Sequence, residues 1–357
     1  MRRMPRFTHT RIARRCARTA VAVATLALVA TGCGGTSGES SDGQGDKGMA
    51  IAFDIGGKGD QSFNDAAYAG LEKARAEFGY EGEAVEPKDG ESDADKVQRL
   101  KQLAKQGYDP VVGIGFIYAN ATKEAAAAYP DTTFGIVDDA TVKADNVAAL
   151  VFNEEQGSYL AGVAAAKASK SRTVGFVGGV DIPLIHKFEA GFAQGVKDTD
   201  PSVKLVKQYL TQTPQEGGFS SPDKGKAAAE AQIEKGADVI YQAAGLSGQG
   251  VVEAAAKAKK WAIGVDSDQY RQKALSKYKR YILTSATKDV GGAVFALAKS
   301  VEDGKPLSGV QRFSLKEGGV GVTESNPEFA KIPGLKAAVD RAKKDIIAGK
   351  IKVATTP

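Results

Sequence analysis

The chain has 357 residues, 48 Lys and Arg against 43 Asp and Glu, and a formal net charge of +5. Its length is enough for a large buried core and suggests two domains. Seven arginines and no acidic residue precede Cys33, so removing this leader takes the net charge from +5 to −2. The rest of the chain therefore has no excess of basic residues that would favour a nucleic-acid partner.

The N-terminal segment has the pattern of an export signal. Its arginines are followed by the apolar run AVAVATLALVA at 20–30 and then by Thr31-Gly32-Cys33. This run is shorter than the ~20 residues that span a bilayer, and a basic region, a short apolar region and small residues are typical of signal peptides. The Cys after Ala-Thr-Gly resembles a bacterial lipobox, which predicts a signal peptide at 1–32 and a lipid on Cys33. An ordinary secretory signal, or a twin-arginine signal at Arg14-Arg15, remains an alternative.

Residues 33–48 are expected to form a flexible tether. The stretch 34–48 reads GGTSGESSDGQGDKG and contains no large apolar side chain. Such a composition cannot bury enough surface to become ordered, and a flexible chain of this length reaches ~20 Å. The second cysteine, Cys16, lies in the leader, so the folded part must be stabilised by its core and not by a disulfide. No later run has the about 18 apolar residues that a further membrane span needs.

From residue 49 the sequence alternates short β-rich runs with Ala-rich helical stretches. In the first half, Ala67, Leu71, Ala74 and Phe78 recur at helical spacing before Gly79, which predicts one helix and its end. By the same reasoning the first half contains strands at 49–55, 110–114, 133–137 and 146–152, and helices at 62–78, 93–106 and 119–129.

The second half repeats the alternation. It predicts strands at 173–177, 203–209, 238–241, 262–265 and 281–285, and helices at 154–169, 184–197, 224–235, 250–259 and 289–302. The tail predicts a hairpin of 310–315 and 319–322 around Glu317-Gly318, and an amphipathic helix at 335–348. Strands separated by helices of this length indicate βαβ units and parallel sheets.

These strands are too many for one sheet, which favours two Rossmann-like lobes, each with an open parallel sheet. No low-complexity linker divides them, so we expect short crossings at the strand 146–152, after Ser285 and near Pro306, which together form a multi-strand hinge. The predicted first lobe is 49–152 plus 286–306, and the second lobe is 153–285 plus 307–357.

Polar residues follow most of the predicted strands. Ligands of open α/β sheets bind outside the carboxyl ends of the strands. Carboxylates there accept strong hydrogen bonds from the hydroxyls of neutral polyols, and they repel phosphates. The phosphate-binding Walker sequence does not occur. Any single Asp could serve only as a helix cap, but the set predicts a binding site. Its members are Asp54, Asp138, Asp139, Asp181, Gly245, Asp266 and Lys288.

Two phenylalanines stand at matching places in the two lobes. The loop GGKGDQSFND at 56–65 puts Phe63 and Asn64 in the first turn of a helix, and Phe188 is in the equivalent helix of the second lobe. An aromatic ring and an amide there could stack on and bond a heterocycle, and the Gly-rich loop 245–250 could donate backbone N–H groups. The structural alternatives are a hydrophobic staple for Phe63 and core packing for Phe188.

The sequence offers little for catalysis. After the leader it has one histidine, His186, and no free thiol, which argues against His/Cys metal sites and cysteine nucleophiles. No Gly-x-Ser-x-Gly elbow accompanies His186, and the adjacent Asp138 and Asp139 would point to opposite sides. We therefore expect no enzyme activity, no cofactor and no metal.

Several motifs in order resemble the basic membrane protein (Bmp) family of bacterial lipoproteins, and within it the purine nucleoside receptors. The resemblance extends from Met49 to about Ile351. Its motifs are FDIGG at 53–57, DQSFN at 60–64, GIVDD at 135–139, NEEQGSYLAG at 153–162, GFVGG at 175–179, IHKF at 185–188, GVDSDQ at 264–269 and TSATK at 284–288.

The resemblance implies a type I periplasmic-binding-protein fold and a monomeric, lipid-anchored receptor on the extracytoplasmic face of the cell membrane. Such a receptor delivers guanosine, adenosine or inosine to the permease subunits of an ABC importer. Carried over, Phe63 and Phe188 would sandwich the purine, and Asn64 with Asp138 or Asp139 would bond its edge. The ribose would be held by Asp266, Gly245 and Lys288, with Asp54 nearby.

Other functions remain open on the residues alone. Stacking aromatics and an acidic edge also suit a sugar receptor of the same fold. A nucleoside-cleaving hydrolase of the envelope would need catalytic groups that the sequence lacks. A surface signalling or interaction lipoprotein with an unused cleft is the third alternative.

Overall fold

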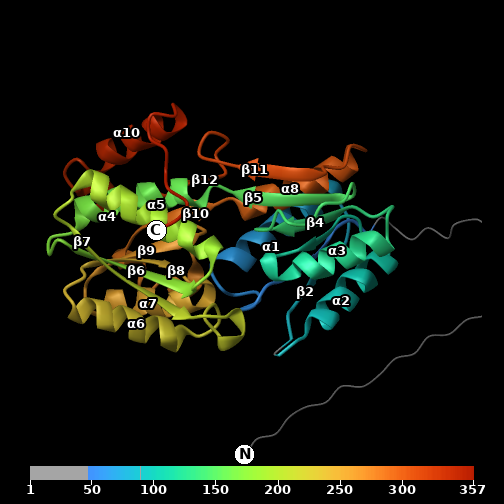
Figure 1. Ribbon diagram of the computed structural model, residues 1–357, viewed down its shortest axis with the longest axis horizontal. Coiled ribbons are helices and arrows are strands. Elements are labelled where there is room, and N and C mark those ends of the chain that lie inside the picture. The colour runs from blue at the N-terminus through green and yellow to red at the C-terminus, as the bar shows by residue number, and fades with distance from the viewer. Residues whose placement is uncertain (1–46, 89) are drawn as a thin grey trace, which may run out of the picture. The chain divides into compact units, whose positions relative to one another are not determined.

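The computed structural model describes residues 47–357 except residue 89 (Figure 1). The predicted signal peptide, Cys33 and almost all of the predicted tether lie outside these residues. The described residues belong to one compact unit, which contains two α/β lobes. Among them, no helix is long and apolar enough to cross a membrane.

The first lobe is built on a six-stranded sheet with the strand order β11-β5-β4-β3-β1-β2. All of its neighbouring strands pair in parallel. The strands are β1 (Ala50–Ala52), β2 (Glu83–Val85), β3 (Val111–Gly113), β4 (Phe134–Val137), β5 (Val147–Phe152) and β11 (Gly309–Phe313). The helices of this lobe are α1 (Phe63–Phe78), α2 (Asp93–Lys105), α3 (Ala119–Ala128) and α8 (Val290–Glu302).

The two faces of this sheet are covered by different helix pairs, α1 with α8 and α2 with α3. Ile51 of β1 belongs to the core under α1 and α8, whereas Ala50 and Ala52 belong to the core under α2 and α3. Successive side chains of a strand point to opposite faces. Because both faces are covered, the strand reads as an uninterrupted apolar run.

The second lobe has the strand order β12-β10-β9-β8-β6-β7. All pairs are parallel except β12 with β10, which is antiparallel. The strands are β6 (Thr173–Val180), β7 (Lys204–Thr211), β8 (Val239–Ala243), β9 (Trp261–Asp266), β10 (Ile282–Lys288) and β12 (Val320–Val322). The helices are α4 (Glu154–Ala168), α5 (Pro183–Thr199), α6 (Pro222–Glu234), α7 (Gly248–Lys257), α9 (Pro327–Lys331) and α10 (Leu335–Ile347).

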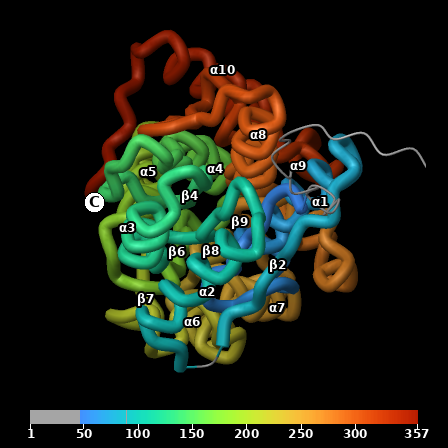
Figure 2. The backbone as a smooth tube through the Cα atoms, turned by 90° about the vertical axis from the view of Figure 1, so that its right-hand side faces the viewer, coloured from blue at the N-terminus to red at the C-terminus, as the bar shows by residue number. Residues whose placement is uncertain are grey.

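This second sheet is also covered on both faces. Phe176 of β6 packs in the core that includes α4 and α5, and the next residue, Val177, packs in the core that includes α6 and α7. In Figure 2, α10 and α4 lie above the strands of this sheet, and α6 and α7 lie below them. The prediction of two α/β lobes with mainly parallel sheets is confirmed.

The chain crosses between the lobes three times within the described residues. It leaves β5 for α4 at Asn153, leaves β10 for α8 at Asp289, and passes from β11 to β12 through 314–319. The second and third crossings lie later than predicted, since β10 extends to Lys288 and β11 still belongs to the first sheet. Residues 286–288 were predicted for the first lobe but lie in the second. Residues 307–313 were predicted for the second lobe but lie in the first.

The predicted hairpin in the tail is wrong. β11 pairs in parallel with β5, and β12 pairs with β10, so the two strands belong to different sheets. Each strand satisfies the backbone groups along an edge that would otherwise be open. Phe313 also stacks on Phe152, with ring centroids 5.2 Å apart, which adds a packing contact that a separate hairpin would lack.

Candidate ligand-binding site

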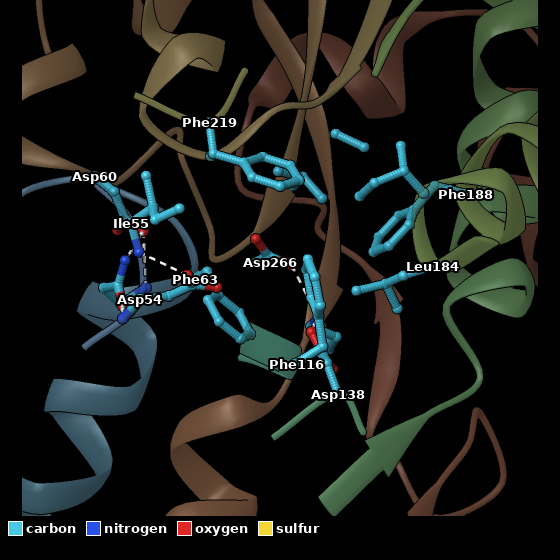
Figure 3. A pocket seen from close by; sticks show the side chains of 16 residues that line it. Asp54, Ile55, Asp60, Phe63, Phe116, Asp138, Leu184, Phe188, Phe219 and Asp266 are labelled. Carbon is cyan, nitrogen blue, oxygen red and sulfur yellow. Dashed lines mark hydrogen bonds and ion pairs between the residues drawn. The ribbon is translucent and has the colours of Figure 1, made fainter. Parts of the chain in front are cut away.

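A cavity with about 510 Å³ of empty space, part of it open to solvent, is lined by residues of both lobes (Figure 3). It lies where β1, β4, β8, β9 and β10 end, so the carboxyl-edge rule for α/β sheets holds. Eight of the ten predicted residues line it, and these are Asp54, Phe63, Asn64, Asp138, Phe188, Gly245, Asp266 and Lys288.

One predicted residue that does not line the cavity is Asp139. Its carboxylate accepts hydrogen bonds from the backbone N–H of Thr141, at 2.8 Å, and from the hydroxyl of Thr141, at 2.7 Å. Asp139 therefore stabilises the turn after β4, and Asp138 is the one of the two that faces the cavity.

Lys288 is the cation of the cavity. Its Nζ lies 2.6 Å from Oδ2 of Asp138, in the first lobe, and 3.8 Å from Oδ1 of Asp266, in the second. Nζ also lies 4.6 Å from the ring centroid of Phe63 and 5.6 Å from that of Phe188. Burial alone would lower the pKa of Lys288, but Asp138, Asp266 and Glu154 raise it above its usual value. Lys288 therefore stays charged, and it contacts both lobes.

Asp138 and Asp266 are held in unusual backbone conformations. Their φ angles are +66° and +61°, in the left-handed region that non-glycine residues rarely occupy. Oδ2 of Asp266 accepts a 2.6 Å hydrogen bond from the hydroxyl of Ser62. Oδ1 of Asp138 is buried and has no hydrogen-bond partner among the described residues. Strained residues are common at ligand sites, and an unpaired buried oxygen can accept a hydrogen bond from a ligand.

Asp60, which the sequence analysis did not single out, organises the start of α1. Its carboxylate accepts hydrogen bonds from the backbone N–H groups of Ser62, Asn64 and Asp65 at 2.8–3.1 Å, and from the side-chain amide of Asn64 at 3.2 Å. Burial raises the pKa of Asp60 to about 6, although the backbone hydrogen bonds act in the opposite direction. The three backbone hydrogen bonds favour the ionised form of Asp60, as a helix N-terminus does.

Asn64 lines the cavity and also bonds neighbouring residues of the first lobe. Its Oδ1 accepts a 2.9 Å hydrogen bond from the backbone N–H of Asp54, and its Nδ2 donates to Asp60. Both ends of the amide are therefore engaged within the protein. Asn64 positions Asp54 and Asp60, and its predicted bond to the edge of a base would have to share these contacts.

Asp54 lies two residues after β1 and is buried. Its Oδ1 accepts a 2.6 Å hydrogen bond from the backbone N–H of Ile55. A Cβ added to Gly115 would lie 2.1 Å from Oδ2 of Asp54, so only glycine fits opposite this carboxyl group. Burial raises the pKa of Asp54 to about 7, and the charges of Asp138 and Asp60 contribute in the same direction.

Four phenylalanine rings border the cavity in Figure 3, namely Phe63, Phe116, Phe188 and Phe219. Phe116 lies in a short 3-10 helix (Phe116–Tyr118) just after β3, so the strand-end rule could have found it. Phe219 lies in the loop between β7 and α6, outside every motif of the sequence analysis. With Leu184 and Ile185, these rings give the cavity an apolar wall around its charged residues.

Other candidates lie away from the cavity. His186 Nε2 lies 2.6 Å from Oδ1 of Asp181, and both residues line a separate surface hollow. In the described part of the chain, no group of three or more His, Cys, Asp and Glu side chains is placed to hold a metal ion. The cavity combines four aspartates with one lysine, so its lining suits a ligand rich in hydrogen-bond donors and disfavours an anion.

A family profile described as an ABC transporter substrate-binding protein, PnrA-like, matches residues 48–354. The chain belongs to this family, the Bmp family. The family consists of substrate-binding proteins of ABC transporters and not of enzymes. The predictions of family and of a non-catalytic protein are thus confirmed.

The chain is also similar to individual proteins over most of its length. The chain is 36% identical to the ABC transporter nucleoside-binding protein BmpA of Lactococcus lactis, over 94% of this chain and 97% of that protein. It is 34% identical to a CD4+ T-cell-stimulating antigen of Listeria innocua, over 94% of this chain and 98% of that protein. It is also 36% identical to an uncharacterized lipoprotein of Pyrococcus furiosus, over 84% of this chain and 75% of that protein.

Solved structures confirm the type I periplasmic-binding-protein fold. A solute-binding protein of an ABC transporter system from Aeropyrum pernix superposes with a TM-score of 0.72 at 28% identity, over 86% of this chain and 93% of that chain. One from Conexibacter woesei superposes with a TM-score of 0.68 at 22% identity, over 86% of this chain and 98% of that chain.

Proposed function

We propose that this Bmp-family protein is the receptor of an ABC importer and binds purine nucleosides in the cavity between its lobes. The observation that carries the proposal is the pairing of an aromatic wall with the buried Asp138–Lys288–Asp266 cluster. Purines are flat and apolar on their faces, whereas ribose presents several hydroxyls. The cavity thus offers suitable partners for both halves of a nucleoside.

In the proposed complex, the base lies between Phe63 of the first lobe and Phe188 of the second. The unpaired Oδ1 of Asp138 accepts a hydrogen bond from an N–H group at the edge of the base. This bond would satisfy a buried acceptor, which is costly to leave unpaired.

The ribose lies at the second lobe in this proposal. Asp266 accepts from its hydroxyls, Lys288 donates to its oxygens, and Gly245 contributes backbone groups. The four aspartates of the cavity disfavour an added phosphate, so nucleosides should bind and nucleotides should not. A role for Asp54 beside the ribose remains part of the proposal.

Ligand binding would act by selecting the closed arrangement of the lobes. Asp138 and Lys288 lie on opposite lobes, so their contact requires closure. A ligand that contacts both lobes shifts the population towards the closed state by its differential affinity. Hinge closure around the three crossings would then give the permease a surface that differs from that of the open receptor.

The second candidate is a sugar receptor of the same fold, which the acidic edge and the aromatic rings also favour. A native mass spectrum of the freshly purified protein separates the two functions, because a receptor with a closed cavity retains its ligand. A retained mass that matches a purine nucleoside supports the proposal. A retained pentose or hexose would support the sugar receptor instead.

We further propose that a lipid on Cys33 anchors the receptor to the extracytoplasmic face of the cell membrane. The support is the lipobox-like Ala-Thr-Gly-Cys pattern and the lipoprotein name of the archaeal relative. Cells that express the full chain and are fed labelled palmitate should label the wild type and not Cys33→Ser. Equal labelling of the two would place the anchor elsewhere.

A further inference from the structure

A set of hydrogen bonds joins the two lobes outside the cavity. The loop that leads into α1 presents the backbone oxygens of Gly59 and Gln61 to the second lobe. Gln249 Nε2 donates to the oxygen of Gly59 at 2.9 Å. Ser267 Oγ and Gln269 Nε2 donate to the oxygen of Gln61 at 2.8 and 3.1 Å. We call these five residues the interlobe seam, and none of them lines the cavity.

The loop is built so that its carbonyl groups face outward. The carboxylate of Asp65 accepts hydrogen bonds from the backbone N–H groups of Gly59, at 2.7 Å, and Gln61, at 3.0 Å. These N–H groups are thus used within the first lobe. Gln61 also has a φ of +56°, a left-handed conformation that persists only where the surroundings hold it.

Two of the three donors on the second lobe are also bonded within that lobe. Gln269 is fully buried, its Oε1 accepts from Gln242 at 3.1 Å, and its backbone N–H donates to Ser285 Oγ at 3.1 Å. The hydroxyl of Ser267 accepts from Gln272 at 3.1 Å. Donors fixed in this way lose little side-chain freedom when the lobes close.

The position of the seam links it to the proposed binding site. Gln61 is followed directly by Ser62, whose hydroxyl bonds Asp266, and then by Phe63 and Asn64. Fixing the Gln61 oxygen on the second lobe therefore fixes the first turn of α1 against the cavity. The contacts involve only backbone oxygens of the loop, so they do not depend on which ligand is bound.

We propose that Gln249, Ser267 and Gln269 are positioning residues for ligand binding, which hold the loop 59–62 in the closed receptor and so slow ligand release. The part of this proposal that concerns nucleoside release rests on the proposed function. The part that concerns lobe closure does not. The seam contributes the same factor to every ligand, and it raises the population of the closed state in the ligand-free protein.

The test uses residues 44–357 with the double substitution Gln249→Ala and Ser267→Ala. The matched control is Gln194→Ala with Ser171→Ala, because these side chains also donate to backbone oxygens, of Lys352 at 3.3 Å and Thr173 at 3.2 Å, but within one lobe. We expect the seam variant to release guanosine, inosine and adenosine about 10-fold faster, roughly threefold for each lost hydrogen bond. The association rates should change much less, the control should match the wild type, and Ser267→Thr should keep the wild-type rate.

A second readout needs no ligand. The segment 47–357 contains no cysteine, so spin labels can be placed at Lys143→Cys in the first lobe and Lys273→Cys in the second, both at exposed positions. We expect the distance distribution of the ligand-free seam variant to shift to longer distances than in the wild type and the control. Unchanged distances with unchanged release rates would overturn the proposal, as would an equal effect of the control. A loss confined to one nucleoside would also overturn it.

The two proposals fail separately in this design. If the wild type binds no nucleoside, the proposed function fails, and the label distances alone still decide whether the seam holds the lobes together.

Discussion

Lys288 of the second lobe and Asp138 of the first form a buried ion pair, with Nζ 2.6 Å from Oδ2 and both side chains 4% exposed. The pair lies beside the cavity and draws the ends of β4 and β10 together. Asp266, 3.8 Å from the same Nζ, shares the cation from within the second lobe. The charge balance of the cavity therefore depends on one lysine.

Removing that lysine should cost both stability and binding. In Lys288→Met, Asp138 and Asp266 lose their counterion while they remain buried, which typically costs about 3–5 kcal/mol in the free energy of unfolding. Urea unfolding measures this change. Lys299→Met is the control, since Lys299 pairs with Asp303 on the surface at 2.8 Å and its loss should leave the free energy of unfolding almost unchanged. Similar midpoints for the two variants would contradict the assigned role of Lys288.

Asp266→Asn should weaken nucleoside binding without disturbing the backbone. Asn tolerates the left-handed conformation of this position, so the change removes mainly the charge. Loss of a charged acceptor for ribose hydroxyls should cost about 1.5–3 kcal/mol of binding free energy, which calorimetry measures. Asp200→Asn is the control, because Asp200 also accepts from a serine hydroxyl, that of Ser202 at 2.7 Å, on the surface. Wild-type affinity in Asp266→Asn would show that the ribose is bound elsewhere.

The stability of the ligand-free protein should depend on pH through Asp54. Burial raises the pKa of this group from 3.8 to about 7, so the folded state keeps a proton that the unfolded state has lost. Its contribution to stability is therefore present at low pH and is lost as the pH rises from about 4 to about 7. In thermal melts across this range, Asp54→Asn should gain stability relative to the wild type as the pH rises. Parallel curves for the two proteins would show that Asp54 does not titrate in this window.

Phe188→Leu should show which half of the ligand, the base or the sugar, contacts this ring. Leu keeps most of the buried volume but removes the flat face on which a base would stack, a loss of about 0.5–1.5 kcal/mol. Affinity for guanosine and inosine should fall by this amount, and any weak affinity for free ribose should not change. An equal loss for ribose would place the sugar, and not the base, against this ring.

Much of the fold could be predicted from the sequence because both sheets are covered on both faces. Buried parallel strands such as β5 then read as short apolar runs between Ala-rich helices. The strand β2 was not predicted because, unlike the equally short β1 and β3, it is only half-buried and does not read as an apolar run. The tail was mispredicted because a short Gly-containing turn does not reveal whether its flanking strands pair with each other or with two different sheets.

The site was predicted less completely, for local reasons. Alternation along a strand does not decide between Asp138 and Asp139, since Asp138 has a positive φ and leaves the strand conformation. Asn64 looked like a ligand contact because of its place at the sheet edge, but its amide is engaged by Asp54 and Asp60. Phe219 reaches the cavity from a loop, where neither periodicity nor a strand end marks it.

The central claim is most directly tested by calorimetric titration of residues 44–357 with guanosine, adenosine, inosine, cytidine and ribose. The proposal predicts tight binding of one or more purine nucleosides, with cytidine and ribose much weaker, because only the purine nucleosides fill both the aromatic and the acidic parts of the cavity. Tight binding of ribose, with no response to any nucleoside, would contradict it.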